Sequence, residues 1–260
     1  MLLCFDVGNS QVYGGFYENN KFSHNFRINT KIGWSSDQLG IFLRSFCREH
    51  NIACEKVNEI AVSSVVPSFD YHLKNACLKY FKVEPMFIKA GIKTGLSVAK
   101  FKSSHEIGAD LICSAVGAVE QYPDSNLLIV DMGTATTITV INSKKEFITG
   151  VIIPGIKTQA ASLAHAAEKL LTVELLRPKT VLAKDTTESI QAGLYYGHLG
   201  AMRLLLRKLA NEALHDQEHK IIATGGFARL FTKSKLFDVF DSDLVLKGLV
   251  KIVSLNPSIR

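Results

Sequence analysis

The apolar positions of this chain follow two periods, one typical of buried strands and one typical of helices that pack on them. Short β-branched or apolar runs predict strands at 2–5, 12–17, 60–66, 87–88, 127–130, 138–141 and 221–223. Apolar residues three or four positions apart predict helices at about 35–46, 69–81, 104–122, 156–171 and 187–214, with two more after residue 226. Strands that alternate with helices indicate a layered α/β fold.

Two hairpins in this pattern repeat one another half a chain apart. The run at 2–5 ends at Asp6, and the run at 127–130 ends at Asp131. Each Asp is followed two residues later by Gly and sixteen residues later by Phe. The repeated unit is a buried strand with a carboxylate at its end, a tight turn whose N–H groups can face an anion, and a returning strand. The repeat predicts two related lobes with a nucleotide between them.

A cluster of turn-forming residues at 123–126 separates the two halves of the chain. We therefore expect an N-terminal lobe at 1–122 and a C-terminal lobe at 123–260. Gly193, Gly197 and Gly200 recur at near-helical spacing in the predicted long helix. A glycine inside a helix costs about 1 kcal/mol relative to alanine, so these three favour close contact with a neighbouring element over a ligand site.

The composition is that of a globular protein, with 47% apolar and 21% charged residues in 260. The net charge is +6, but the Lys and Arg residues are scattered, which favours anionic small molecules over nucleic acid as partners. The first residues lack a basic leader pattern, and no apolar run approaches the ~20 residues of a membrane span, so we expect a cytoplasmic protein without a membrane partner. The five cysteines form no C-x-x-C pair and are expected to be buried, reduced thiols.

The matched acids at 6 and 131 are the first candidates for chemistry. A lone Asp after a strand is usually a cap or turn residue, but two such acids at converging strand ends can hold a cation against a polyphosphate. The small residues after each acid offer donors to phosphate oxygens. The chain contains neither G-x-x-x-x-G-K-[ST] nor G-x-G-x-x-G, so P-loop and Rossmann nucleotide sites lose their main support.

Asp110 lies in the first turns of the helix predicted at 104–122, directly after Gly108 and Ala109. One interpretation is a first-turn acid that interacts favourably with the helix dipole. The other is a general base that accepts a proton from a substrate hydroxyl in a phosphoryl transfer.

The turn at 224–226, Thr-Gly-Gly, likewise allows two interpretations. It is either a plain strand-to-helix connection or a place where a flat ring or a sugar approaches the backbone.

The order and spacing of the motifs in this chain resemble those of the type III pantothenate kinases, a family of the acetate/sugar kinase, Hsc70 and actin superfamily. The resemblance covers nearly the whole chain. It rests on Asp6-Val7-Gly8-Asn9-Ser10, Ser63-Ser64-Val65-Val66-Pro67, Glu106-Ile107-Gly108-Ala109-Asp110, Asp131-Met132-Gly133-Thr134-Ala135-Thr136-Thr137, Ile153-Pro154-Gly155, Thr186 with Glu188-Ser189-Ile190-Gln191-Ala192-Gly193, and Thr224-Gly225-Gly226.

The resemblance implies two ribonuclease-H-like (actin-like ATPase) lobes, each a mixed sheet flanked by helices, in a homodimer. It implies a transferase that uses ATP to phosphorylate pantothenate to 4'-phosphopantothenate, the first step of coenzyme A biosynthesis. Asp110 would be the general base, Asp131 would bind a monovalent cation (K⁺ or NH₄⁺), and Asp6 is a candidate ligand for Mg²⁺. ATP would contact Asp6, Val7, Gly8, Asn9, Ser10, Gln11, Val12, Tyr13 and Thr134. Pantothenate would contact Phe101, Gly108, Ala109, Asp110, Leu111 and Thr186.

Two positions depart from the family pattern on the acceptor side. Leu111 stands where the family usually has Arg, and Phe101 keeps the ring of a usual Tyr without its hydroxyl. The lost Arg removes a partner for a substrate carboxylate, for which Lys100 or Lys102 could partly substitute as a point charge. Three hypotheses follow: an active pantothenate kinase with a changed pocket, a catalytically weak nucleotide-binding relative with a regulatory or partner-binding role, and a kinase for another small hydroxylated acceptor.

Overall fold

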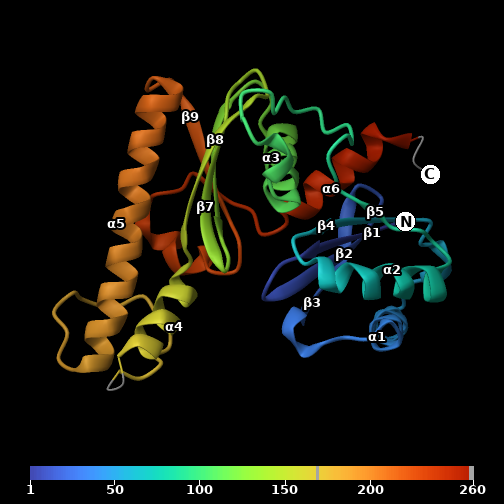
Figure 1. The fold of residues 1–260 in the computed structure, drawn as a ribbon, viewed down its shortest axis with the longest axis horizontal. Coiled ribbons are helices and arrows are strands. Elements are labelled where there is room, and N and C mark those ends of the chain that lie inside the picture. Colours follow the sequence, from blue (N-terminus) through green and yellow to red (C-terminus); the bar gives the residue numbers. More distant parts are fainter. Residues whose placement is uncertain (168–169, 258–260) are drawn as a thin grey trace. The chain divides into compact units, whose positions relative to one another are not determined.

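The computed structural model describes residues 1–167 and 170–257, and the chain divides into two compact units (Figure 1). The first unit contains Met1–Leu96, Ser103–Gln121 and the segment from Leu244 onward, and the second contains Ser97–Lys102 and Tyr122–Asp243. The expected change of lobe after residue 122 lies next to the change of unit after Gln121. The division differs from the expected one at two places, because a short piece before 103 joins the second unit and the last helix joins the first.

Each unit is built on a five-stranded mixed sheet, and both sheets have the same topology. The first has the order β3-β2-β1-β4-β5, made of β1 (Leu2–Val7), β2 (Gln11–Glu18), β3 (Lys21–Asn29), β4 (Glu59–Ser64) and β5 (Met86–Phe87). The second has the order β8-β7-β6-β9-β10, made of β6 (Asn126–Met132), β7 (Ala135–Ile141), β8 (Phe147–Pro154), β9 (His219–Thr224) and β10 (Val239–Phe240). Asp6 and Asp131 occupy the same place, the penultimate residue of the first strand.

Helices cover both faces of the first sheet. They are α1 (Ser36–Glu49), α2 (Pro67–Phe81), α3 (Ala109–Gln121) and α6 (Leu244–Leu255). Because side chains alternate along a strand, Leu3, Phe5 and Val7 of β1 enter the core beneath α1 and α2. Leu2 and Cys4 enter the other core, beneath α3 and α6. The same alternation directs Asp6 toward the α3 face.

The last helix belongs to the first unit because two glycines let it cross α3 at backbone distance. A side chain at Gly117 would collide with the carbonyl of Leu244, and one at Gly248 would collide with the carbonyl of Cys113. Each helix therefore uses a glycine where the other helix passes. The crossing brings the C-terminal part of the chain onto β1 and β4, which the order of motifs along the sequence did not predict.

The described helices of the second unit pack on one face of its sheet, as Figure 1 shows. They are α4 (Ile156–Ala166), α5 (Thr186–Leu214) and a 3-10 helix (Ala228–Ser234). The helix predicted at 156–171 ends at Ala166, and positions 168–169 lie outside the described residues. The two helices expected after residue 226 are the 3-10 helix and α6, with β10 between them. Among the described residues, no helix combines the length and apolarity needed to cross a bilayer.

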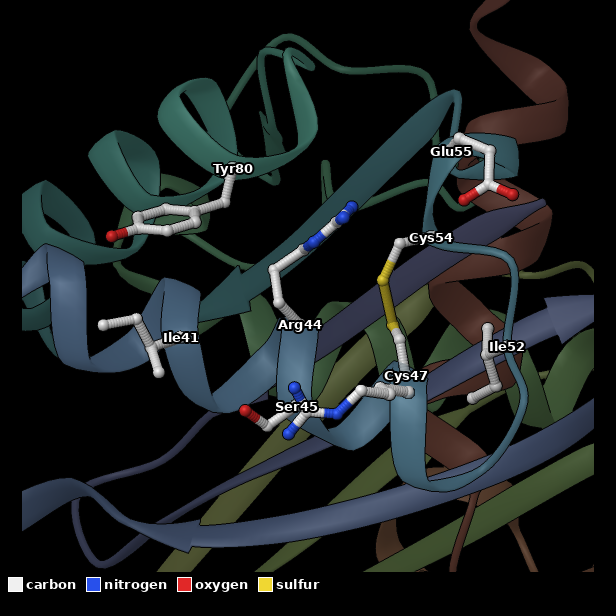
Figure 2. Close-up of a pocket in the computed structure, with 9 residues that line it drawn as sticks. Ile41, Arg44, Ser45, Cys47, Ile52, Cys54, Glu55 and Tyr80 are labelled. Carbon is white, nitrogen blue, oxygen red and sulfur yellow. A yellow bond between two sulfur atoms is a disulfide. The ribbon is translucent and has the colours of Figure 1, made fainter.

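The expectation that all five cysteines are reduced is wrong for one pair. Cys47, near the end of α1, and Cys54, in the following 3-10 turn, form a disulfide with a Cα–Cα distance of 6.1 Å (Figure 2). The sequence spacing of seven gave no sign of it, because the contact depends on how the chain turns back after α1. Cys4, Cys77 and Cys113 are free and buried, as expected. The disulfide borders a cavity of about 520 Å³ that Arg44 and Arg48 also line.

We expect three of the five cysteines to react with a thiol reagent in denaturant without reductant, and all five after reduction. A cross-link over so short a loop stabilises a fold by about 2–3 kcal/mol, so reduction should lower the free energy of unfolding by that amount. Thiol titration and urea unfolding measure the two effects. The Cys47→Ser/Cys54→Ser variant serves as the control, since reductant should leave its unfolding curve unchanged. Five reactive thiols in the unreduced protein would contradict the assignment.

Candidate active site

The turn between β1 and β2 carries most of the predicted ATP contacts in the first unit. The Gly8 N–H donates to the carbonyl of Gln11 at 3.0 Å and closes the turn. Thr30 braces it from the end of β3, since its hydroxyl donates to the Gly8 carbonyl at 2.7 Å and its N–H donates to the Ser10 carbonyl at 3.2 Å. The side chains of Val7 and Val12 are buried in the core, so these two residues can offer a ligand only backbone groups.

Tyr13, the last of these predicted contacts, is held by β3. The guanidinium of Arg27 lies 3.8 Å from the centre of the Tyr13 ring, and the Asn25 amide donates to the Tyr13 hydroxyl at 2.6 Å. Arg27 therefore places a positive charge beside the turn through a cation–π contact. The sequence analysis did not single out Arg27, Asn25 or Thr30, because the predicted hairpin ended before β3.

Asp6 and Asp110 belong to one cluster on the α3 face of the first sheet. Asp6 pairs in register with Ser63 of β4, and the Ser63 hydroxyl lies against the thiol of Cys113, one turn after Asp110 on α3. Burial raises the pKa of the Cys113 thiol well above its usual value, and the charges of Asp6 and Asp110 raise it further. The charges of both acids therefore act on one thiol, although residues 6 and 110 are far apart in the sequence.

The environment of Asp110 favours a role of its carboxylate as a general base. Burial raises the pKa of its carboxyl, and the backbone N–H of Leu111, which donates to Oδ1 at 2.8 Å, partly opposes that shift. A desolvated carboxylate accepts a proton more readily than an exposed one. Gly108 lies beside it, and a side chain at that position would displace the Asp110 carboxylate from its present position.

The second turn is braced as the first one is. The Gly133 N–H donates to the Ala135 carbonyl at 2.9 Å and closes the turn between β6 and β7. The carbonyl of Thr134 accepts from the N–H of Gly155 at 3.0 Å and from the hydroxyl of Thr158 at 2.6 Å. A side chain on Gly155 would collide with the carbonyls of Gly133 and Thr134. The start of α4 therefore lies directly against this turn.

Asp131 faces the turn at 224–226 and a hydroxyl. Gly225, with φ of 90°, passes so close that a side chain there would strike the Asp131 carboxylate and the Met132 backbone. Thr137 pairs in register with Asp131, and among the described residues its buried hydroxyl oxygen has no hydrogen-bond partner. Carboxylate and hydroxyl oxygens are ligands that hard cations accept.

Neither acid belongs to a multi-residue metal cage. In the part of the chain that the structure describes, no group of three or more His, Cys, Asp and Glu side chains could hold a metal ion. Mg²⁺ at phosphate sites is bound by one or two carboxylates, waters and phosphate oxygens, so the single carboxylates Asp6 and Asp131 fit such an ion.

A cavity adjoins the second turn within the second unit. It measures about 640 Å³ and is lined by Lys157, Ala160, Ala161, Ala164, His165, Thr172, Val173, Leu175 and Phe227. The N–H of Phe227 donates to the Met132 carbonyl at 3.0 Å, which ties the backbone of Phe227 to the start of the turn. An apolar cavity with one aromatic wall and a lysine suits a planar base carrying an anionic tail.

The predicted acceptor residues are divided between the units. Gly108–Leu111 lie in the first unit, whereas Phe101 and Thr186 lie in the second. Phe101 packs edge-to-face on Phe147 with a centroid distance of 5.4 Å, and Thr186 is the exposed first residue of α5. The roles of these residues stay predictions.

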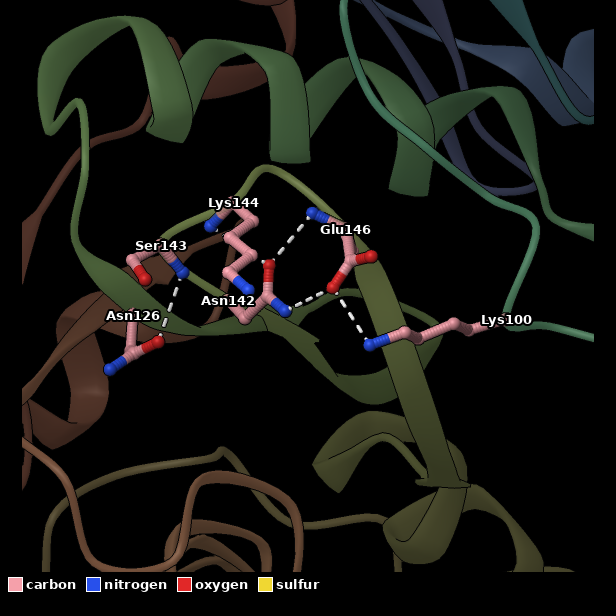
Figure 3. Close-up of polar contacts among 6 residues, drawn as sticks. All are labelled: Lys100, Asn126, Asn142, Ser143, Lys144 and Glu146. Atoms are coloured by element: carbon pink, nitrogen blue, oxygen red, sulfur yellow. Dashed lines mark hydrogen bonds and ion pairs between the residues drawn. The ribbon is translucent and has the colours of Figure 1, made fainter.

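Lys100, considered as a substitute for the missing arginine, is already paired. Its Nζ lies 2.8 Å from Glu146 Oε2, which also accepts a hydrogen bond from the Asn142 side-chain amide. Beside this group, the backbone N–H of Ser143 donates to the side-chain oxygen of Asn126 (Figure 3). Lys100, followed by Asn142, lowers the pKa of Glu146, so the carboxylate remains charged opposite the lysine. Lys102 is exposed.

The duplicated sheet, with an acid-tipped first strand in each copy, defines the actin-like ATPase class of folds. Consistent with this, the structure matches that of MreB 5 of Spiroplasma citri bound to AMPPNP with a TM-score of 0.53 at 12% identity, over 99% of this chain and 97% of that chain.

The family follows from the sequence comparisons. A family model described as type III pantothenate kinase matches residues 2–208. The type III pantothenate kinase of Legionella pneumophila (strain Paris) is 43% identical over 98% of this chain and 99% of its own length. That of Elusimicrobium minutum (strain Pei191) is 41% identical over the full length of both. The chain belongs to the type III pantothenate kinase family.

Gly155→Ala should distort the second turn. The added methyl group meets two backbone carbonyls that cannot move away, so we expect the free energy of unfolding to fall by about 1–3 kcal/mol and the affinity for ATP to fall with it. Gly150→Ala on β8 is the matched control, because its methyl group would approach no atom closer than 3.8 Å. Urea unfolding and calorimetric ATP titration measure the effects. Equal behaviour of the two variants would contradict the close packing of Gly155 on the turn.

Proposed function

We propose that this protein transfers the γ-phosphoryl group of ATP to the primary hydroxyl of pantothenate, forming 4'-phosphopantothenate in the first step of coenzyme A biosynthesis. The observation that carries this proposal is the 43% identity, over nearly the full length of both chains, to a protein named type III pantothenate kinase. No observation favours the regulatory relative or the kinase for another acceptor.

The residues of both turns bind the nucleotide in this proposal. Asp6–Tyr13 and Thr134 contact the phosphates through the backbone donors that the two closed turns present. The cavity beside Phe227 takes the nucleoside, with Lys157 near the phosphates. Asp6 ligates Mg²⁺ and Asp131 ligates a monovalent cation, K⁺ or NH₄⁺. Bound there, the cations offset negative charge on the transferred group.

The chemical step needs a base and an in-line acceptor. Asp110 accepts the proton of the pantothenate hydroxyl as its oxygen bonds to the γ-phosphorus, while the bond from that phosphorus to the β,γ-bridging oxygen breaks and ADP leaves. The raised pKa of Asp110 supports this role, because it makes the carboxylate a stronger base. Gly108 keeps the space that the carboxylate occupies, and Ala109 continues the wall of the acceptor pocket.

In the proposed complex, the carboxylate of pantothenate is the substrate group that the site binds least well. Leu111 offers no charge, and Lys100 is engaged with Glu146. Thr186 and Phe101 contact pantothenate in this proposal, with Phe101 contributing its ring alone. We therefore expect weaker pantothenate binding than an arginine at position 111 would give.

The active protein in this proposal is a cytoplasmic homodimer. Its support is the outer face of α5, where Gly193, Gly197 and Gly200 are exposed and an added side chain would meet nothing within 4 Å. Tyr196 and Leu204 are exposed on the same helix. The glycines expected to allow close contact therefore have no such neighbour in the described part of this chain, and a second copy would supply one. Sedimentation measures this directly.

The wild-type protein should form phosphopantothenate from ATP and pantothenate with Mg²⁺ and K⁺, and Asp110→Asn should abolish turnover while leaving ATP affinity nearly unchanged. Because the base must be ionised and burial raises its pKa, wild-type kcat should fall with decreasing pH at values above the ordinary range of an aspartic acid. A coupled assay for ADP and mass spectrometry of the product measure both. Absence of product at every pantothenate concentration would reject the function, and wild-type turnover by Asp110→Asn would reject the base.

Leu111→Arg should lower the KM for pantothenate by about tenfold, because a hydrogen bond to a charged group contributes about 1.5–3 kcal/mol. Leu111→Lys is the matched control and should gain less, since a point charge lacks the planar fork of a guanidinium. Steady-state kinetics with varied pantothenate measures the change. An unchanged KM in Leu111→Arg would mean that the pocket has adapted to leucine, and a large rise from near-zero activity would indicate a decayed enzyme.

A further inference from the structure

His198 of α5 lies in a buried network that no part of the sequence reading singled out. Its side chain is 1% exposed. Its Nε2 lies 3.0 Å from the hydroxyl of Thr136 on β7, and its Nδ1 lies 2.9 Å from Nε2 of Gln159 on α4. One imidazole therefore connects three elements of the second unit.

The partners of Gln159 fix the tautomer of His198. Nε2 of Gln159 also lies 2.8 Å from the carbonyl of Pro154, which can only accept. That nitrogen is therefore an amide donor, and its other hydrogen points to His198 Nδ1. Nδ1 must accept, so the ring is neutral with its proton on Nε2, where it donates to Thr136.

This network ends at the second turn. Thr136 pairs in register with Met132, across the turn from Thr134. Thr134 is itself bonded to Gly155 and Thr158 at the start of α4. The turn is thus tied to α4 directly through Thr134 and indirectly through Thr136, His198 and Gln159.

We propose that His198 is a positioning residue for the second turn, which it holds in its ATP-binding shape as a neutral imidazole that accepts from Gln159 and donates to Thr136. The proposal uses the nucleotide site of the proposed function. No other common side chain accepts at one atom and donates at another across this spacing while filling the volume of a ring.

Protonation of His198 breaks the network. A second ring proton places two donors, Nδ1–H and the Gln159 amide, against each other. The ring faces Gln159, Thr136 and Phe231, whose centroid lies 5.6 Å away. The titratable neighbour one turn earlier on α5 is Tyr195, which burial keeps neutral by raising its pKa against the opposing charge of Arg177. Burial lowers the pKa of His198, so the neutral form persists through physiological pH.

The first test compares His198→Phe, which keeps the ring and removes both nitrogens, with His198→Gln, which can restore a donor toward Thr136. His215→Gln at the exposed C-terminal end of α5 is the matched control. We expect His198→Phe to raise the KM for ATP by about tenfold, the equivalent of one or two lost hydrogen bonds, with the KM for pantothenate changed less than about twofold. His198→Gln should recover part of the loss, and His215→Gln should match the wild type.

The second test is a pH profile. In the wild type, the pH profile of kcat/KM for ATP should contain an acidic step, at a pH below the ordinary range of a histidine, where His198 takes up a proton. This step should be absent in His198→Gln, which keeps only the fall that comes from Asp110. A residue that only fills space would not change the pH profile. An identical acid limb for ATP in both proteins would overturn the proposal.

Hydrogen exchange provides a readout that needs no turnover. The amides of 131–137 and 155–159 should exchange faster in His198→Phe than in the wild type, while those of β1 and β2 remain unchanged. If His198→Phe does not fold, Gln159→Met removes the donor to Nδ1 and should give the same local effect. Unchanged exchange at 131–137 in a folded variant overturns the role of His198 even if the wild type phosphorylates pantothenate. Conversely, a wild type inactive on pantothenate with the expected exchange pattern rejects only the proposed function.

Discussion

The structure depends on a carboxylate fixed at the end of a buried strand by a turn that closes on itself. In each unit a glycine N–H bonds to a carbonyl two or three residues further along, and a more distant residue then holds the turn from outside. Thr30 does this in the first unit, and Gly155 with Thr158 does it in the second. The backbone donors are therefore oriented before a ligand arrives, so binding need not order them, and preorganised donors of this kind stabilise developing charge most effectively.

Much of the fold could be predicted from local signals. The repeat around Asp6 and Asp131 predicted two related halves, and the sheets have identical strand orders. The spacing of apolar residues predicted a helix at about 35–46, and α1 begins at Ser36, where Ser35 forms a capping box with Gln38. The roles of the site residues stay predictions. The charges of Asp6 and Asp110 act on one thiol, that of Cys113, but only the family resemblance connected these two acids, since the hairpin repeat contains no information about α3.

The remaining features depend on contacts between segments distant in the sequence, which short patterns do not record. The crossing of α3 and α6 relies on Gly117 and Gly248, two glycines that read as ordinary helix positions until the helices are placed together. The disulfide depends on the path of the chain after α1. A single histidine within a 29-residue helix has no periodic signature, and His198 gains its partners only when α4 and β7 pack against α5.

The placement of α6 also constrains the order in which the first unit can be completed during synthesis. The strands of its sheet and the helix that carries Asp110 all lie before residue 122, but the partner that covers α3 is α6, more than 120 residues further along the chain. A nascent chain in which α6 has not yet been made therefore exposes the apolar side of α3. The acid–thiol cluster beneath that helix acquires its final surroundings only once α6 has packed on it.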